Sequence, residues 1–194
     1  MRRVNILIAG VGGQGSLLAS RILGAFYLAQ GLDVKVSEVH GMSQRGGSVV
    51  TYVRAGERVD SPLIPEGEAD LLIALEQLEA LRWLPHVKPE GAVVMSDQKI
   101  PPMPVIAGKE AYPENIAETI RASGRRLTVA DAPALAAQAG NPRASNIALL
   151  GAAARLLGGD KELWDNALEA CVKPKFLESN RTAFALGGDI NVLE

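Results

Sequence analysis

An apolar run near the start of the chain ends in a cluster of glycines, and this junction constrains the fold more than any other feature. Residues 3–9 are rich in valine, isoleucine and leucine, as in a strand that is buried on both faces of a sheet. The following glycines have the spacing G-x-G-x-x-G, and a long apolar-periodic segment comes next. This order predicts a strand, a tight turn and a helix over residues 15–30, which Gly31 ends.

Each glycine of this motif has a physical role in such a turn. Gly10 would allow the chain to turn sharply out of the strand, and Gly12 would allow a ligand to approach the backbone. Gly15 would allow the helix to lie close to the sheet, so that the unpaired N–H groups of its first turn point to an anion above the loop. Gly13 and Gln14 complete the loop. The alternative is a glycine turn that only packs a strand against a helix.

Strands and helices alternate along the next hundred residues or so, and the last third changes character. The patterns predict further strands at residues 33–38, 48–55, 70–75, 92–97 and 127–130. They predict helices at residues 77–84, 113–123, 134–139, 145–157, 161–172 and 174–186. Prolines make residues 101–104 a stiff connection, and Ser145 can cap its helix. We therefore expect one α/β domain over residues 1–194, with a Rossmann-like, doubly wound, mostly parallel sheet and a helical C-terminal third.

A second glycine-rich segment, residues 38–47, follows the second predicted strand. It should lie at the carboxyl edge of the sheet, beside the first glycine loop. Arg45 could hold a phosphate or a carboxylate through two hydrogen bonds, or it could pair with Glu38. His40 could donate, accept or titrate near neutral pH, or it could only fix the loop. The candidate binding residues of this segment are His40, Gln44, Arg45, Gly46 and Gly47.

A dinucleotide-binding function is one interpretation of this arrangement. Glu38 stands roughly twenty residues after Gly15, where dinucleotide enzymes place the acid that binds the ribose hydroxyls. The rest of the chain gives this interpretation little support, because no Cys/His, Ser/His/Asp or Lys/Tyr constellation indicates chemistry on a substrate. His86 has no partner at a useful spacing, Glu76 and Glu79 are expected on a solvated helix face, and no metal-ligand spacing is present.

The charge balance and the single cysteine argue against several functional classes. With 20 basic and 22 acidic residues the net charge is −2, without the basic excess typical of nucleic-acid or membrane-surface binding. No apolar run approaches the roughly 20 residues of a membrane span, and the start lacks the pattern of a signal peptide, so we expect a cytoplasmic protein. Cys171 can form neither a disulfide within the chain nor an iron–sulfur cluster, which needs about four cysteine ligands.

The two glycine motifs together resemble the gamma-type domain of the 2-oxoacid:ferredoxin oxidoreductases. The first motif is Gly-Val-Gly-Gly-Gln-Gly, and the second has His-Gly-Met-Ser-Gln before Arg-Gly-Gly, where the pyruvate and 2-oxoglutarate branches usually have Ser-Tyr-Gly-Pro-Glu. In this respect the chain is similar to the small (beta) subunit of the indolepyruvate branch. The resemblance continues through residues 68–70, 145–151 and 176–187, and so covers nearly the whole chain.

The resemblance implies a subunit that is not active alone. The family converts a 2-oxoacid, coenzyme A and oxidised ferredoxin into an acyl-CoA, carbon dioxide and reduced ferredoxin, with thiamine diphosphate, Mg²⁺ and [4Fe–4S] clusters as cofactors. The chain lacks the cluster cysteines and the thiamine diphosphate motif, so the cofactors would lie on a larger partner subunit, and ferredoxin would act through the complex.

The resemblance also assigns roles to individual residues. The family uses this domain to help form the substrate and coenzyme A side of the site. The loop would be lined by Gly12, Gly13, Gln14 and Gly15. The partner or the coenzyme A phosphates would be faced by His40, Gln44 and Arg45. The different second motif favours aryl pyruvates as the 2-oxoacid.

Overall fold

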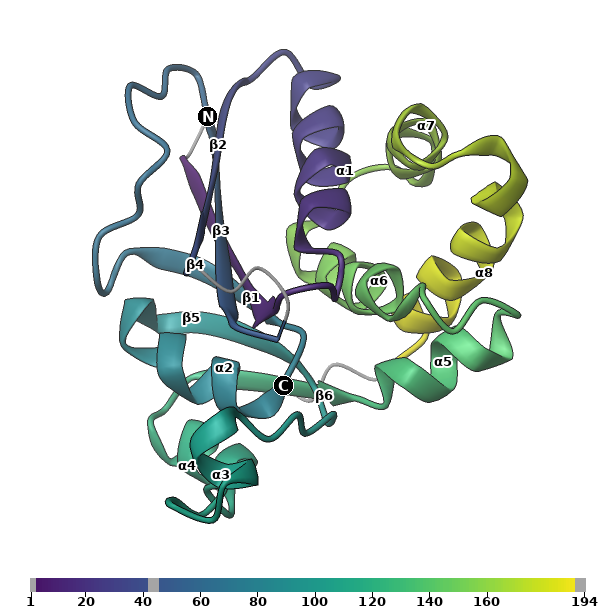
Figure 1. Ribbon diagram of the computed structural model, residues 1–194. Helices are drawn as coiled ribbons and strands as arrows, with labels where there is room; N and C mark the ends of the chain where they lie inside the picture. The colour runs from purple at the N-terminus through teal and green to yellow at the C-terminus, as the bar shows by residue number, and fades with distance from the viewer. Residues whose placement is uncertain (1–2, 42–45, 191–194) are drawn as a thin grey trace.

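The computed structural model describes residues 3–41 and 46–190, which form a sheet covered by helices on both faces (Figure 1). The strands of this part are β1 (Val4–Val11), β2 (Asp33–His40), β3 (Ser48–Gly56), β4 (Ala69–Ala74), β5 (Val87–Ser96) and β6 (Arg126–Ala130). The helices are α1 (Ser16–Leu28), α2 (Gln77–Trp83), α3 (Met103–Ile106), α4 (Ile116–Ala122), α5 (Ala132–Gln138), α6 (Ser145–Leu157), α7 (Lys161–Cys171) and α8 (Leu177–Gly188). Short 3-10 helices are η1 (Leu84–His86) and η2 (Pro174–Phe176).

The sheet is mostly parallel, as predicted, but one inner strand runs against the others. Its order is β2-β3-β1-β4-β5-β6, with parallel pairing from β1 through β4 and β5 to β6. β3 is antiparallel to both β2 and β1. The segment after β2 therefore returns to the end of β1, where Ser48 lies opposite Val11. This pairing brings the two glycine motifs together at the carboxyl edge of the sheet.

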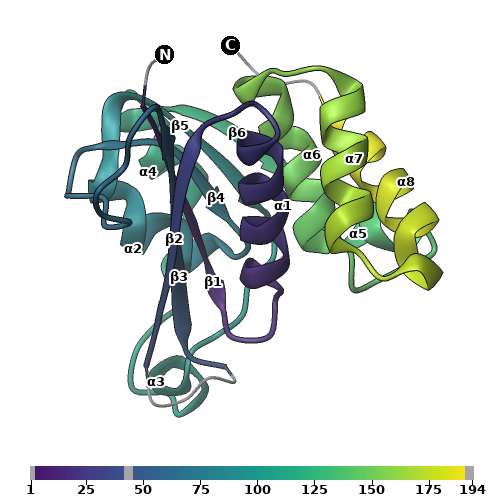
Figure 2. The same ribbon diagram turned by 90° about the horizontal axis from the view of Figure 1, so that it is seen from above.

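The helices form layers on the two faces of the sheet (Figure 2). α2 and α4 cover one face, α1 and α6 cover the other, and α5, α7 and α8 lie outside α1 and α6. Side chains of β1 enter both cores in alternation: Ile6 and Ile8 pack in the core with α1 and α6, while Leu7 and Ala9 pack in the core with α2 and α4. A strand that is buried on both faces needs this continuous apolar sequence.

Glycines allow α6 and α8 to cross at a short distance. A Cβ atom at Gly151 of α6 would lie 2.0 Å from the carbonyl oxygen of Phe184, which belongs to α8. A Cβ atom at Gly187 of α8 would lie 1.8 Å from the carbonyl oxygen of Ala148, which belongs to α6. Since real Cβ atoms cannot approach a carbonyl oxygen so closely, both glycines are required for this helix crossing.

Several element boundaries differ from the predictions, mainly near prolines. The connection at residues 101–104 contains the start of α3, with Pro102 at its N-cap and a proline in its first turn, where no backbone donor is needed. The helix expected from residue 113 begins at Ile116, and β5 begins five residues earlier than expected, at Val87. The last predicted helix is divided into η2 and α8.

Ser145 does not cap α6 as the sequence suggested. The N-cap residue is Ala144, and the Ser145 hydroxyl donates instead to the carbonyl oxygen of Pro142, 3.4 Å away. The predicted end of this helix is confirmed, because Gly158 forms its C-cap. The first turn of α6 is therefore left without a side-chain cap.

Replacing Gly187 by alanine should destabilise the fold by at least about 2 kcal/mol, because the new methyl group overpacks the crossing of α6 and α8. Gly24→Ala is the matched control, since it lies inside α1 and its Cβ would meet no described atom within 4 Å. That variant should be neutral or more stable than wild type by about 0.5–1 kcal/mol. Urea unfolding of both variants measures the difference, and equal stabilities would contradict the proposed crossing.

Candidate functional site

The two glycine loops are joined by backbone hydrogen bonds. The Gly12 N–H donates to the Gly47 carbonyl oxygen at 2.8 Å, and the Gly46 N–H donates to the Gly12 carbonyl oxygen at 3.4 Å. The expected adjacency of the two motifs is thereby confirmed. Two predicted site residues of the second loop, Gln44 and Arg45, lie outside the described residues.

Gln14 fixes the first loop to the ends of three strands. Its Oε1 accepts a hydrogen bond from the Val11 N–H at 2.7 Å. Its Nε2 donates to the Leu75 carbonyl oxygen at 2.9 Å and to Oε1 of Gln98 at 3.0 Å. These residues follow or end β1, β4 and β5, so the amide group covers the point where the helices change from one face of the sheet to the other. Gln14 therefore acts first as a structural anchor of the loop.

Gly10 serves a different purpose from the one predicted. It does not turn the chain out of the strand, because β1 continues to Val11 and Gly10 pairs with Val49 of β3. A Cβ atom at Gly10 would lie 2.9 Å from Oε1 of Gln14 and 3.0 Å from Cβ of Leu75. Gly10 therefore makes room for the Gln14 side chain.

Gly13 and Gly15 shape the turn itself, because both have positive φ angles, of 103° and 87°. At Gly15 the close neighbour is α6: a Cβ atom there would lie 2.7 Å from Nδ2 of Asn146, which donates to the Gly15 carbonyl oxygen at 2.9 Å. At Gly13 no described atom lies within 4 Å of the corresponding position. Gly15 is thus needed for packing, whereas Gly13 faces open space.

A pocket lies on each side of the first glycine loop. The one that we call the loop pocket has a volume of about 450 Å³ and is lined by Gly12, Gly13, Gly15, Ser16, Leu17, Glu38, His40 and Val49. The one that we call the α6 pocket has a volume of about 300 Å³ and is lined by Gly13, Gln14, Leu75, Gln98, Pro142, Arg143, Ser145, Asn146 and Leu149. Gly13 borders both pockets, so the loop separates two possible binding spaces.

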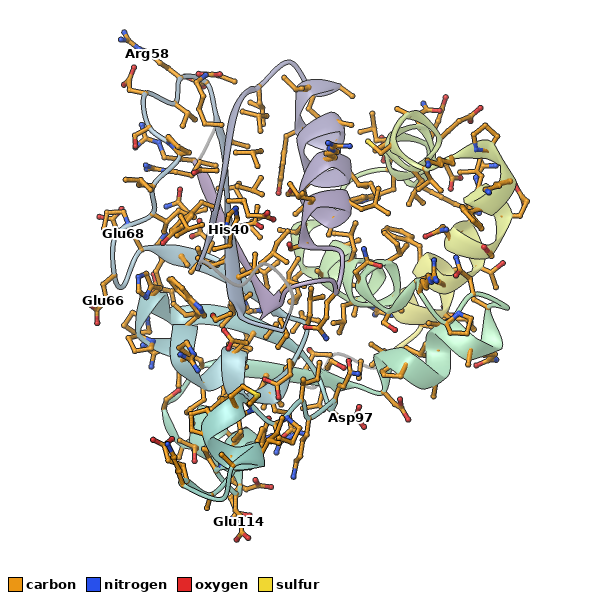
Figure 3. The ribbon with its side chains drawn as sticks, viewed as in Figure 1. His40, Arg58, Glu66, Glu68, Asp97 and Glu114 are labelled. Atoms are coloured by element: carbon orange, nitrogen blue, oxygen red, sulfur yellow. The ribbon has the colours of Figure 1, made fainter. Side chains whose placement is uncertain are left out.

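His40 and Glu38 reach the loop pocket from the end of β2. His40 is exposed (Figure 3), and its Nδ1 lies 3.1 Å from the Gly41 carbonyl oxygen. Oε2 of Glu38 accepts hydrogen bonds from the hydroxyl groups of Ser16, at 3.0 Å, and Thr51, at 3.1 Å. Glu38 therefore connects β2, β3 and the first turn of α1.

Two buried carboxylates were not recognised from the sequence. Glu76 and Glu79 were expected on a solvated helix face, but they are only 1% and 4% exposed. Oε2 of Glu76 accepts from the Glu79 N–H at 3.0 Å and so caps α2, while its Oε1 accepts from the Ile100 N–H and the Tyr112 hydroxyl. The sequence signal for this arrangement is weak, because the usual capping box begins with serine or threonine and not with glutamate.

Glu79 connects α2 to the second loop. It accepts a hydrogen bond from the hydroxyl of Ser48, which directly follows Gly47, and it lies 3.3 Å from Nε of Arg82. Burial raises the pKa of Glu79 above its usual range, although Ser48 and Arg82 favour the charged form. A carboxyl group that is hard to ionise therefore anchors the start of β3.

The carboxyl edge also carries an acidic group at the end of β5. Burial and the nearby Asp131 raise the pKa of Asp97 (Figure 3). In the part of the chain that the structure describes, no three His, Cys, Asp or Glu side chains are grouped to hold a metal ion. No helix of this part has the length and apolar character needed to cross a membrane.

Glu79→Gln should make the free energy of unfolding less dependent on pH. Because the pKa of Glu79 is higher in the folded state, its contribution to stability is greatest below the unfolded pKa of about 4.3 and falls as the pH rises through the raised value. Glutamine can still accept the Ser48 hydrogen bond but does not ionise. Urea unfolding at several pH values should therefore show wild type losing stability relative to the variant as the pH rises.

The exposed Glu114 (Figure 3) offers a control for the loss of one negative charge. The stability of Glu114→Gln should follow that of wild type across the same pH series. A difference between Glu79→Gln and wild type that stayed constant with pH would contradict the role given to Glu79.

The chain is similar to known proteins along nearly its whole length. Residues 5–190 match the family described as pyruvate ferredoxin/flavodoxin oxidoreductase. The indolepyruvate oxidoreductase subunit IorB of Thermococcus kodakarensis is 40% identical over 192 residues, which cover 96% of this chain and 95% of that subunit.

Solved structures share the fold. The gamma subunit of keto/oxoacid ferredoxin oxidoreductase from Geobacter sulfurreducens has a TM-score of 0.71 and 24% identity over 95% of each chain. The 2-oxoglutarate:ferredoxin oxidoreductase from Magnetococcus marinus, solved with coenzyme A bound, has a TM-score of 0.72 and 21% identity; the match covers 100% of this chain and 32% of that one. Since the family match spans nearly all of the sequence, this chain belongs to the pyruvate ferredoxin/flavodoxin oxidoreductase family.

Proposed function

We propose that this chain is the small subunit of an indolepyruvate:ferredoxin oxidoreductase and forms the coenzyme A side of its active site. The observation that carries the proposal is the 40% identity with an indolepyruvate oxidoreductase subunit along nearly the whole of both chains. In the complex, an aryl pyruvate, coenzyme A and oxidised ferredoxin become an acyl-CoA, carbon dioxide and reduced ferredoxin. The protein would work in the cytoplasm.

The polar side chains around the glycine loops support a binding role rather than a catalytic one, because structural hydrogen bonds already occupy them. Gln14 bonds to the backbone and to Gln98, and Glu38 accepts from two hydroxyl groups. The chain has a single cysteine, and burial raises the pKa of this thiol, so its donor set does not fit an iron–sulfur cluster. Thiamine diphosphate, Mg²⁺ and the clusters would therefore be held by a larger subunit, which supplies the redox chemistry.

In this proposal the loop pocket and the second loop face coenzyme A and the partner. One large apolar side chain of the pocket wall is exposed: Leu17 at the start of α1 is 48% exposed. Such a side chain next to a binding loop suits contact with another protein. His40, Gln44 and Arg45 would complete this surface, and the guanidinium group of Arg45 suits a phosphate or a carboxylate.

The alternative, a stand-alone NAD- or nucleotide-binding protein, receives less support from the geometry. β3 separates the strand of Glu38 from β1, whereas a simple dinucleotide fold places these strands side by side. The amide of Gln14 also covers the ends of β1 and β4, close to where such folds hold the pyrophosphate.

Reconstitution of the complex tests the proposed function. The chain is co-expressed with the larger subunit from the same source, and coenzyme A-dependent reduction of ferredoxin is assayed with indolepyruvate, pyruvate and 2-oxoglutarate. We expect turnover with the aryl pyruvate in the complex and none with either subunit alone. Turnover by the isolated chain, or tight binding of NADH to it without complex formation, would refute the proposal.

Gly13→Ala should impair the complex more than it impairs the fold. The new methyl group would enter the open space above the loop, and the positive φ angle would cost about 1 kcal/mol in stability. Gly31→Ala is the matched control, because Gly31 also has a positive φ angle and open space around it but follows α1 at the other end of the helix. Thermal unfolding should show similar losses for both variants.

The two variants should differ in catalysis. Only Gly13→Ala should raise the KM for coenzyme A or weaken subunit association. If both variants gave complexes with wild-type kinetics, the loop would have a purely structural role.

A further inference from the structure

A pocket of about 420 Å³ lies at the amino edge of the sheet, where the parallel strands β1, β4, β5 and β6 begin. Its lining includes Val4, Asp70, Lys88 and Arg126 near these strand starts, together with residues from the ends of α1 and α6. We call it the amino-edge pocket. β4, whose six residues span roughly 20 Å, runs from this pocket to the first glycine loop at the opposite edge. The proposed function assigns no task to the amino-edge pocket.

A bulge in β5 shapes one side of this pocket. The register of β5 against β4 shifts between Ala69 and Leu71, where β4 advances two residues and β5 advances five. The extra residues of β5 belong to the segment 88–91, most of which lines the pocket. Gly91 ends this segment, and a Cβ atom there would lie only 2.6 Å from Cγ1 of Val87. Bulges are over-represented next to active sites, where they direct side chains.

Tyr27, near the end of α1, brings an unpaired hydroxyl group to the pocket. The residue is only 5% exposed, yet its hydroxyl has no hydrogen-bond partner among residues 3–41 and 46–190. Buried polar groups usually have a partner, so an unpaired hydroxyl in a pocket wall points to a ligand. Burial and the nearby Asp70 carboxylate raise the pKa of Tyr27, so the hydroxyl keeps its proton and can donate a hydrogen bond.

The charged side chains of the pocket leave one guanidinium group without a carboxylate. Nζ of Lys88 lies 2.5 Å from Oδ1 of Asp70, whose other oxygen accepts a hydrogen bond from a backbone N–H. These two side chains therefore satisfy each other. Arg126 forms no ion pair and no side-chain hydrogen bond within the described part of the chain. The remaining charges, on the exposed Arg3 and Glu90, are opposite, so the pocket has a net positive charge.

Leucine side chains supply apolar surface next to these polar groups. They are Leu32, Leu71, Leu156 and Leu157. We propose that the amino-edge pocket binds a carboxylate that carries an apolar body. The carboxylate accepts hydrogen bonds from the Tyr27 hydroxyl and the Arg126 guanidinium group, and the body packs on the leucines. Its single negative charge matches the one unpaired guanidinium group, whereas a phosphate monoester would bring up to two.

NMR titration of the full chain with phenylacetate tests the site. We expect saturable shifts of the backbone signals of Gln30, Leu32 and Gly91, which line the pocket. Acetate lacks the apolar body and phenylacetamide lacks the charge, so both should bind at least about tenfold more weakly. A smaller difference for either compound, or unchanged signals with phenylacetate, would overturn the proposal.

Tyr27→Phe removes only the hydroxyl group. It should weaken phenylacetate binding at least about tenfold, because one hydrogen bond to a charged group is lost. The variant should fold normally, since this hydroxyl has no partner within the described residues. Tyr52→Phe is the matched control, because Tyr52 is a buried tyrosine whose hydroxyl also lacks a described partner and which packs in the core on the other face of the sheet. It should bind phenylacetate as wild type does.

Arg126→Gln tests the charge in the same way and should weaken binding by a similar factor. Arg121→Gln is its control, because it removes the same charge from an exposed position on α4, over the other face of the sheet. Equal binding by the two tyrosine variants, or by the two arginine variants, would show that the pocket does not hold the carboxylate.

Octanoate distinguishes the two kinds of apolar body. Tighter binding of phenylacetate than of octanoate indicates an aromatic ligand, the reverse indicates an aliphatic one, and the site stands in both cases. Because the titration needs no partner subunit and reads signals at the amino edge, its failure would leave the proposed oxidoreductase function untouched. Inactivity of the complex would equally leave the amino-edge pocket untouched.

Discussion

The hydrogen bonds between Gly12 and the backbone of Gly46 and Gly47 determine where the proposed binding surface of this protein lies. They exist because β3 runs back along β1, so that the segment after β2 must end beside the first glycine loop. Gln14 then secures the same loop to β4 and β5. Two motifs that are about thirty residues apart thus form one surface at the carboxyl edge of the sheet.

The sequence predicted the helices and strands of this fold better than it predicted which strands lie side by side. The continuous apolar run of β1 and the alternating sequence of β3 both indicate strands. A strand buried on both faces is apolar throughout, and a strand buried on one face alternates between apolar and polar residues. No local pattern says that β3 is inserted between β1 and β2, since strand order depends on long-range pairing. The adjacency of the two loops could be predicted only because both follow strands that point to the same edge.

The candidate site was predictable to a similar extent. The glycine spacing located the loop, but the tasks of Gly10 and Gly15 depend on Gln14 and Asn146, which the fold brings against them. Glu76 and Glu79 were misjudged for the same reason. A carboxylate is normally solvated, and the groups that allow these two to be buried, from Ser48 to Tyr112, are distant in sequence. Whether a polar side chain can be buried depends on the hydrogen-bond partners that the fold brings to it.

The glycine contact between α6 and α8 links the outer helices to the first glycine loop. α6 has 13 residues and is roughly 20 Å long; its first turn contacts the glycine loop through Asn146, and Gly151 at its middle lies against α8. Because a helix is stiff, a displacement at the middle of α6 also moves its ends. A substitution in α8 that moves this crossing would therefore also move the contact that Asn146 of α6 makes with the glycine loop.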